Sequence, residues 1–343
     1  MKRHLNTLYV TTPGAYLAKE GEAVLVRLDA VDLARIPLHT LASIVCFGPI
    51  GFSPFLLGLC GERGVAVSFL SEHGRFLARL EGPISGNVLL RREQYRRADA
   101  PAASAALARA FIAAKLANSR TVLQRALRDR PEAEGAAALQ SAAGELAPLL
   151  ASLVEGLPLD PLRGIEGTAA RVYFEAFDAL ITRQKSAFFF RERSRRPPLD
   201  NVNALLSFLY TLLRHDVESA LAAVGLDPAV GFLHRDRPGR ASLALDLMEE
   251  LRAFLADRLA LSLINLQQIR PAGFRCGETG GVVMDEETRK TVLVAYQKRK
   301  DEEIVHPFLG ETTTVGLLPY LQAALLARHL RGDLDGYPPF LWK

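Results

Sequence analysis

The sequence changes character near residue 87, and this change constrains the fold more than any other feature. Before it, short apolar runs alternate with glycine, proline and other turn residues, a pattern typical of β-strands. After about residue 102, apolar residues recur with helical spacing in an alanine-rich chain. We therefore predict an α+β protein: a small N-terminal β-domain (residues 1–84), a basic linker (85–101) and a larger all-α domain (102–343).

The first domain is predicted to contain six strands and one short helix. The helix is expected near residues 55–63, because Ser53 and Pro54 suit a helix start and Gly61 and Gly64 suit its end. The strands are expected at residues 8–10, 16–17, 23–26, 43–47, 65–69 and 75–79. In the second domain we expect helices at about 103–128, 201–224, 242–267 and 285–300, and a non-helical tail at 333–343.

Composition excludes several classes of protein. The 343 residues are 49% hydrophobic, which is enough to form two domains that each have a hydrophobic core. The pI near 9.0 mildly favours an anionic partner. The cysteines Cys46, Cys60 and Cys276 show no CxxC spacing, so we expect neither a disulfide framework nor a zinc knuckle, and a reducing cytoplasm fits. We expect no signal peptide and no membrane span, because the uncharged run at residues 40–61 is broken by prolines and glycines.

The expected helix at residues 242–267 carries three acids on one face. Ser242 suits its N-cap, and at 100° per residue Asp246, Glu249 and Glu250 gather opposite the apolar side. His234 lies in the loop just upstream. One interpretation is half of a metal site, because an acid cluster on so apolar a helix needs a counter-charge. The other is a solvated acidic face beside a loop histidine.

A fourth acid, Glu166, lies between two glycines where another helix is expected to begin. The helix macrodipole favours an acid in a first turn whatever its other role. The small neighbours Gly164 and Gly167 would also let a ligand or a backbone segment approach closely. Both interpretations stay open on local evidence.

Basic residues gather in two places that we consider as DNA contacts. The helix at residues 103–128 aligns basic and amide side chains, and residues 183–196 form the strongest basic patch, beside a phenylalanine triplet at 188–190. Arginines beside aromatic rings can clamp phosphates and stack bases, whereas a solvated basic face and a buried triplet are the plain alternatives. The candidates are Lys115, Arg120, Arg183, Lys185, Arg191, Arg193, Arg195, Arg196 and Arg240.

Four separated motifs together resemble a known family. They are IEG at residues 165–167, RRPPLDNVNALLSFLY at 195–210, GFLH at 231–234 and SLALDLMEE at 242–250. In this order they resemble the CRISPR-associated endonuclease and integrase of spacer acquisition, the Cas-one family, over the whole chain. GNVLLRREQY at 86–95 and YPPFLW at 337–342 resemble its type I-C branch.

The resemblance implies a divalent-metal site made by a glutamate, a histidine and a second acid. Carried over to this sequence, these ligands are Glu166, His234 and Glu249, with Asp246 close to the metal, while Glu250 remains an alternative third ligand. Mg²⁺ and Mn²⁺ suit such hard ligands, and Mn²⁺ tolerates an imidazole better.

The resemblance also implies an activity and partners. The expected activity is metal-dependent cleavage of DNA and insertion of short duplexes (prespacers) into the CRISPR repeat, with water or a DNA 3′ hydroxyl as the attacking group. The implied partners are double-stranded DNA, a second copy of the chain, the small adaptation partner (Cas-two) and an adaptation exonuclease. The β-domain is expected to mediate the homodimer, because so small a domain gains from burying a further face. A non-catalytic helical DNA-binding scaffold is the alternative function.

Overall fold

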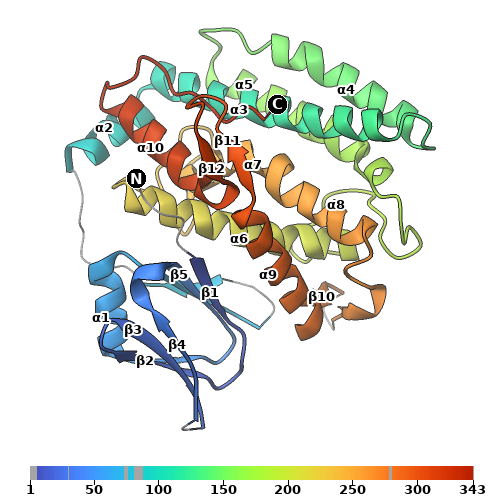
Figure 1. Cartoon of the computed structure of the whole chain (residues 1–343). Coiled ribbons are helices and arrows are strands. Elements are labelled where there is room, and N and C mark those ends of the chain that lie inside the picture. Colours follow the sequence, from blue (N-terminus) through green and yellow to red (C-terminus); the bar gives the residue numbers. More distant parts are fainter. Residues whose placement is uncertain (1–5, 30, 73–75, 81–87, 278–279, 343) are drawn as a thin grey trace. The chain divides into compact units, whose positions relative to one another are not determined.

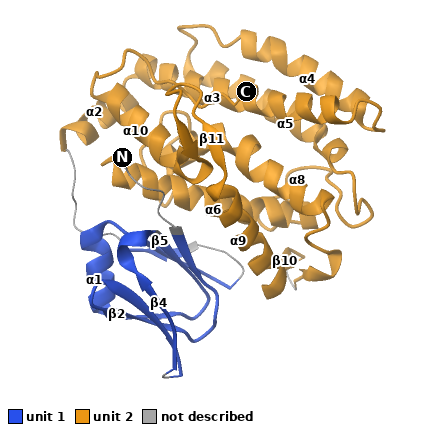
Figure 2. Cartoon of the chain, viewed as in Figure 1, with its two compact units in different colours: residues 1–86 blue, residues 87–343 orange. Residues whose placement is uncertain are grey.

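The computed structural model describes residues 6–29, 31–72, 76–80, 88–277 and 280–342. The chain divides into two compact units, residues 1–86 and residues 87–343, which are coloured separately in Figure 2. The predicted end of the β-domain at residue 84 lies outside the described residues. The predicted α+β class, with a β-rich unit followed by a helical one, is confirmed (Figure 1).

The described strands of the first unit form two four-stranded sheets. One sheet has the order β1-β5-β7-β8, with β1, β5 and β7 parallel; the other has the order β4-β3-β2-β6. Their bounds are β1 Asn6–Val10, β2 Tyr16–Glu20, β3 Ala23–Leu28, β4 Val31–Pro37, β5 Leu41–Phe47, β6 Gly51–Phe52, β7 Ala66–Leu70 and β8 Phe76–Arg79. Strands β4 and β6 escaped prediction because one is an exposed edge strand rich in poor strand formers and the other is only two residues long.

Buried apolar residues from several strands form the core of the first unit. Leu17, Val24, Ile44 and Val67 are fully buried in one apolar cluster. The predicted short helix is present as α1 (Pro54–Arg63), which follows Ser53 and ends at Gly64 in the left-handed conformation. Glycine has no Cβ to clash in that conformation, so it ends a helix at low cost.

The described part of the second unit is mainly helical, with two short antiparallel strand pairs that the sequence did not predict. Its helices are α2 Val88–Asp99, α3 Pro101–Asp129, α4 Ala136–Ala151, α5 Leu159–Glu175, α6 Asn201–Ala223, α7 Ser242–Leu251, α8 Arg258–Asn265, α9 Glu286–Asp301 and α10 Leu318–Leu330. The strand pairs are β9 (Phe274–Cys276) with β10 (Val282–Met284), and β11 (Glu303–Val305) with β12 (Thr312–Thr314). The described part of the tail after α10 is non-helical, as predicted.

The segment predicted as a basic linker is largely the helix α2, and it belongs to the second unit. Arg92 and Arg96 are exposed, but Leu90 and Gln94 are buried. The Gln94 amide donates to the backbone oxygens of Asp227 and Val230, each at 2.8 Å. These contacts join α2 to the loop before α7, so the segment is anchored structure rather than a connector.

The central helix of the second unit is α3. It packs against α4, α5 and α7 (Figure 1). Its buried face includes Phe111 and several alanines, whose small side chains allow neighbouring helices to approach closely. Within the described ranges no single helix is long and apolar enough to cross a membrane. Helices α2 and α3 reach that length and hydropathy only when they are taken together, and they are bent by 96° where they join.

The run predicted as one helix at residues 242–267 has three parts. Helix α7 continues as a π-helical segment, Arg252–Asp257, and then as α8. The predicted N-cap is wrong by one residue: Ala241 holds the cap position, and the Ser242 hydroxyl donates to the Arg235 backbone oxygen at 3.2 Å. The serine therefore ties the helix to its preceding loop instead of capping it.

Candidate active site

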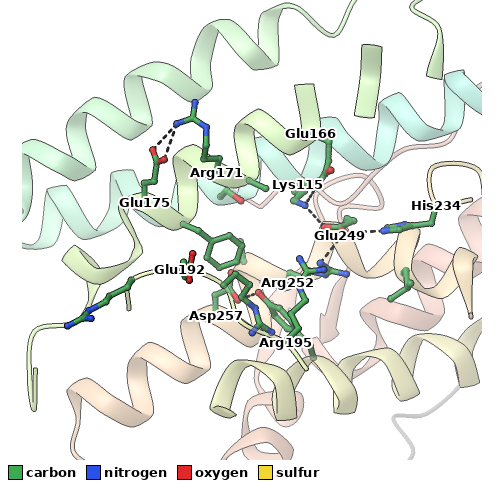
Figure 3. Close-up of a pocket in the computed structure, with 18 of the residues that line it drawn as sticks. Lys115, Glu166, Arg171, Glu175, Glu192, Arg195, His234, Glu249, Arg252 and Asp257 are labelled. Atoms are coloured by element: carbon green, nitrogen blue, oxygen red, sulfur yellow. Dashed lines mark hydrogen bonds and ion pairs between the residues drawn. The ribbon is translucent and has the colours of Figure 1, made fainter. Parts of the chain in front are cut away.

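A cavity of 640 Å³ lies inside the helical unit, and charged side chains dominate its lining (Figure 3). The cations are Lys115, Arg171, Arg191, Arg193, Arg195, Arg240 and Arg252, and the acids are Glu166, Glu175, Glu192, Glu249 and Asp257; His234 also lines it. Cations outnumber carboxylates, so the cavity suits a polyanionic ligand such as a nucleic-acid backbone.

Glu166 and Glu249 meet across the ammonium group of Lys115. Lys115 Nζ lies 2.9 Å from Glu249 Oε2 and also pairs with Glu166 Oε1 (Figure 3). Lys115 belongs to α3, Glu166 to α5 and Glu249 to α7, and both α5 and α7 pack against α3. The sequence suggested that Glu166 lies in the first turn of a helix. That expectation is wrong, because α5 begins at Leu159, seven residues earlier. Helix packing therefore explains its position, and the macrodipole of the first turn does not.

Glu249 is a buried acid that stays charged. Burial by itself would raise its pKa, but Arg252, Lys115 and His234 outweigh that effect and lower the pKa to about 2. Arg252 Nη1 lies 3.1 Å from Glu249 Oε1, and His234 Nε2 lies 4.0 Å from the same oxygen. The carboxylate is therefore anionic at neutral pH and directed at the cavity.

His234 is oriented by Asp246, which is itself fully buried. The Asp246 carboxylate accepts hydrogen bonds from the backbone N–H groups of Phe232 (2.6 Å), Leu233 (2.9 Å) and His234 (2.9 Å), and it lies 2.6 Å from His234 Nδ1. When Nδ1–H is donated to Asp246, the other ring nitrogen, Nε2, faces Glu249. Asp246 therefore holds both the loop and the ring.

Glu250, the neighbour of Glu249, is directed away from the cavity. Its carboxylate accepts hydrogen bonds from the Tyr337 hydroxyl (2.6 Å), the Gln322 amide (2.7 Å) and the Phe340 backbone N–H (2.8 Å). Burial raises the pKa of Glu250 to about 7, although these hydrogen bonds act in the opposite direction. Between the two adjacent acids, Glu249 is thus the one that lines the cavity with Glu166 and His234.

The solvated acidic face considered as an alternative is not what the structure contains. Asp246, Glu249 and Glu250 have exposed fractions of 0%, 2% and 0%. Each acid instead has its own buried surroundings: a loop backbone, a charged cavity and the C-terminal tail. Buried charges need partners to offset their desolvation, and each of the three has them.

The π-helical segment adds two residues that the sequence analysis missed. Residues five apart in an α-helix lie about 140° apart, whereas a turn closed between residues i and i+5 brings them to the same side. Arg252 and Asp257 both line the cavity. The only sequence signal was the position of Arg252, three residues after Glu249, which is the spacing of a helical ion pair.

Asp257 is buried within a tyrosine and arginine network. It accepts hydrogen bonds from the hydroxyls of Tyr210 (2.6 Å) and Tyr173 (3.1 Å), and burial raises its pKa to about 6 despite those bonds. The guanidinium groups of Arg193 and Arg252 lie over the Tyr210 ring at 5.3 Å and 5.2 Å. This network forms a second, arginine-rich wall of the cavity.

The carboxylate and imidazole groups of this site are ligand types that fit a hard divalent cation, although the two carboxylates contact Lys115 instead. Among the described residues, no group of three His, Cys, Asp or Glu side chains could hold a metal ion as they stand. Lys115 Nζ already contacts a carboxylate oxygen of both Glu166 and Glu249. Two carboxylates that together hold one cation, beside an imidazole fixed through Nδ1, are nevertheless the ligand types that Mg²⁺ and Mn²⁺ accept.

The candidate DNA contacts fall into two groups. Five of them line the cavity: Lys115, Arg191, Arg193, Arg195 and Arg240, whereas Arg120, Arg183, Lys185 and Arg196 do not. Four of the candidates also contact other groups of the protein: Lys115 the two glutamates, Arg193 Asn203 Oδ1 at 2.6 Å, Arg120 the Ala143 backbone oxygen at 3.0 Å, and Lys185 Asp178 Oδ2 at 3.0 Å. Their charges are therefore partly committed to the protein itself.

The phenylalanine triplet beside these arginines is mostly core. Phe188 and Phe190 are buried, while Phe189 is 38% exposed. Phe190 packs on Phe174 and Phe177 with ring centroids 5.5 Å and 5.0 Å apart. The plain interpretation thus holds for two of the three rings, and only Phe189 has a surface beside Arg191, at 5.3 Å.

Comparison with known proteins assigns the family. The family described as CRISPR associated protein Cas1 matches residues 8–298. A protein from Chlorobaculum tepidum, named CRISPR-associated endonuclease Cas1 1, is 57% identical over 343 residues, and the match covers 100% of both chains. The chain belongs to the Cas1 family. This is the Cas-one family that its motifs resemble, so that prediction is confirmed. A second Cas1 protein, CRISPR-associated endonuclease Cas1 2 of Rhodospirillum rubrum, is 55% identical over 348 residues and is also covered in full.

Solved structures agree with the fold. A CAS1 protein from Thermotoga maritima matches with a TM-score of 0.80 at 22% identity, covering 96% of this chain and 97% of that one. A casposase bound to integration product matches with a TM-score of 0.82 at 22% identity, covering 99% and 95%. At these identities the likeness to known Cas1 structures establishes the fold alone.

Two further matches are parts of larger proteins. A Geobacter sulfurreducens protein named CRISPR-associated exonuclease Cas4/endonuclease Cas1 fusion is 36% identical over 97% of this chain and 60% of its own. A chain of a Cas6-RT-Cas1–Cas2 complex matches with a TM-score of 0.82 at 23% identity, covering 100% of this chain and 36% of that one. Cas1 sequences thus occur fused to Cas4, and Cas1-like folds occur in assemblies with Cas2.

Proposed function

We propose that the chain is a metal-dependent DNA endonuclease and integrase of CRISPR adaptation, which joins short duplexes to the CRISPR repeat through their 3′ hydroxyls. The observation that carries this proposal is the meeting of Glu166, His234 and Glu249, from separate parts of the sequence, in one cation-rich cavity. Relatives that are more than half identical and named endonucleases support it.

Glu166, His234 and Glu249 would hold the divalent cation, for which Mg²⁺ and Mn²⁺ are our candidates. When bound, such a cation neutralises charge on a phosphodiester and stabilises the leaving oxygen. Asp246 sets the orientation of the imidazole, and Arg252 keeps Glu249 anionic within the protein. The attacking group is water in cleavage and a DNA 3′ hydroxyl in joining, so the reaction requires no covalent protein nucleophile.

The arginines of the lining supply the grip on DNA in this proposal. Arg191 and Arg195 are exposed, and Arg240 is partly so, which leaves guanidinium groups able to meet phosphates. Contacts of this kind position a nucleic acid without reading its sequence. Arg183, Lys185 and Arg196 are proposed to extend the same grip outside the cavity.

We further propose the partners and the subtype. The first unit would form the homodimer, which the exposed edge strand β4 supports, since Val31 and Leu33 are 61% and 50% exposed there. The Cas1–Cas2 assembly and the Cas4/Cas1 fusion support a Cas2 partner and an adaptation exonuclease. The type I-C assignment still depends on the motifs at residues 86–95 and 337–342.

The test is an integration assay with a labelled 3′-hydroxyl duplex and a repeat-containing target, with and without Mn²⁺. The wild-type chain should give a product of the joined length only with the metal, and His234→Ala should abolish it while most DNA affinity remains, since basic residues supply non-specific binding. The matched control is His329→Ala, which removes a half-buried histidine of the same unit that bonds Arg97 and Leu334 instead. Unchanged joining by His234→Ala would overturn the proposed metal site, and DNA binding without any joining by the wild-type chain would favour the non-catalytic scaffold.

A further inference from the structure

Lys115 occupies an unusual place for a lysine. Its side chain is only 13% exposed, and its ammonium group lies between two carboxylates that come from two other helices. Lys300, another buried lysine of the same unit, pairs with Asp216 at 3.0 Å and does not line the cavity. Lys115 instead contacts the two carboxylates that the proposed function assigns to the metal.

The two carboxylates differ in how many cations they contact. Glu249 uses Oε1 for Arg252 and Oε2 for Lys115, so it keeps one cationic partner when Lys115 is removed. For Glu166, the ion pair that the described structure shows is with Lys115. Without that ammonium, the two acids would face each other across the cavity with less positive charge between them.

We propose that Lys115 is a built-in substitute for the metal cation, which holds Glu166 and Glu249 together in the metal-free protein and must withdraw before a metal can bind them. This inference rests on the proposed function, because it takes these carboxylates as metal ligands. The ammonium group and a divalent cation need the same oxygens and repel each other at such short range. Lys115 therefore lowers metal affinity, and its four-carbon stem gives it the freedom to move aside.

The experiment measures Mn²⁺ binding to the full chain by electron paramagnetic resonance of the free ion. Lys115→Met keeps the stem and removes the charge, so Mn²⁺ should bind about tenfold more tightly or better. Lys115→Arg keeps the charge and should bind about as weakly as wild type. The control, Lys300→Met, removes a buried lysine of the same unit outside the cavity and should leave Mn²⁺ affinity unchanged.

Thermal unfolding gives a second readout. Metal-free Lys115→Met should unfold at a lower temperature than wild type, because the two carboxylates lose their shared cation, and Mn²⁺ should raise its unfolding temperature by more than it raises that of wild type. Lys115→Gln, which is also neutral but retains an amide donor for the carboxylates, provides the same comparison if the methionine variant does not fold.

The outcomes separate this inference from the proposed function. If wild type binds Mn²⁺, Glu166→Gln weakens that binding and neutral variants of Lys115 bind no more tightly, then Lys115 is an ordinary structural partner and the inference is overturned while the metal site survives. If no variant binds Mn²⁺, both the metal site and the inference fail. Tighter binding by both neutral variants, with Lys115→Arg unchanged, supports the inference.

Discussion

Glu249 and Glu250 are adjacent in α7 and both are buried. Their surroundings nevertheless shift the two carboxyl pKa values in opposite directions. On the cavity side the pKa of Glu249 is lowered to about 2, and on the tail side the pKa of Glu250 is raised to about 7. Arg252 and Lys115 face the first acid, whereas neutral donors face the second. Burial alone therefore does not decide the charge of an acid; the net charge of its partners does.

The tail side acts as a structural lock. Gln322 of α10 and Tyr337 bond Glu250, and the Asn118 amide of α3 donates to the backbone oxygens of Glu250 (2.7 Å) and Phe340 (2.9 Å). The C-terminal segment is thereby tied to the helix that carries Glu249. One side of α7 holds the architecture, and the other presents charge for chemistry.

The strongest way to break this comparison is to neutralise each acid in turn. Glu249→Gln should reduce metal-dependent joining at least about 100-fold, because even residues that only orient ligands cost 10- to 100-fold when changed. Glu250→Gln should stay within a few-fold of wild type, since a glutamine can still accept from Gln322 and Phe340. Rates from the integration assay measure both; similar losses in the two variants would mean that the sides of α7 are not functionally distinct.

The pH dependence of stability should sharpen the comparison. The folded-state pKa of Glu250 is about 7, above its ordinary value of 4.5, so between these values the folded chain keeps a proton that the unfolded chain releases. The free energy of unfolding should then fall as pH rises from about 4.5 to 7, by about 3 kcal/mol from this group, at 1.36 kcal/mol per pKa unit.

Glu250→Gln isolates that effect from Asp257, whose pKa of about 6 gives a loss of the same sign. Denaturant unfolding at pH 5 and pH 7.5 should show a smaller decrease in the variant than in wild type. Glu249 has the opposite sign: its contribution is present above pH 4.5 and is lost as pH falls toward 2, outside this window. If the free energy of unfolding decreases equally with pH in wild type and variant, Glu250 is charged in the folded protein, like Glu249.

The smallest expected effect concerns the tail hydroxyl. Tyr337→Phe leaves the buried Glu250 without its shortest hydrogen bond, which should lower the free energy of unfolding by about 1–2 kcal/mol. Tyr95→Phe is the matched control, because Tyr95 donates to Asp227 at an exposed site, where water replaces the lost partner. Joining activity should change little in either variant. If Tyr337→Phe lowers the free energy of unfolding by no more than Tyr95→Phe does, the hydrogen bond from Tyr337 to Glu250 does not stabilise the fold.

Local patterns predicted much of the fold because short-range physics determines them. Ser53-Pro54 and Gly64 bound α1 as expected, and α6 and α9 begin after Asp200 and Asp285, whose side chains accept from backbone N–H groups three residues on. The start of α5 was missed because Pro161 and Gly164 suggested a break before Glu166, whereas a proline is tolerated in the first turn of a helix. The linker was misassigned because exposed arginines concealed the buried Leu90 and Gln94.

The sequence by itself determined the α+β class, the family and a short list of chemical residues, because these depend on periodicity, turn chemistry and motif order. It could not separate Glu249 from Glu250, since residues 100° apart on a helix are both compatible with an acidic face. Only the tertiary structure decided between them, by bringing Lys115 from α3 to one acid and Tyr337 from the tail to the other. The physical reason is that orientation and charge state depend on partners that lie far away in sequence and become neighbours only when the helices pack.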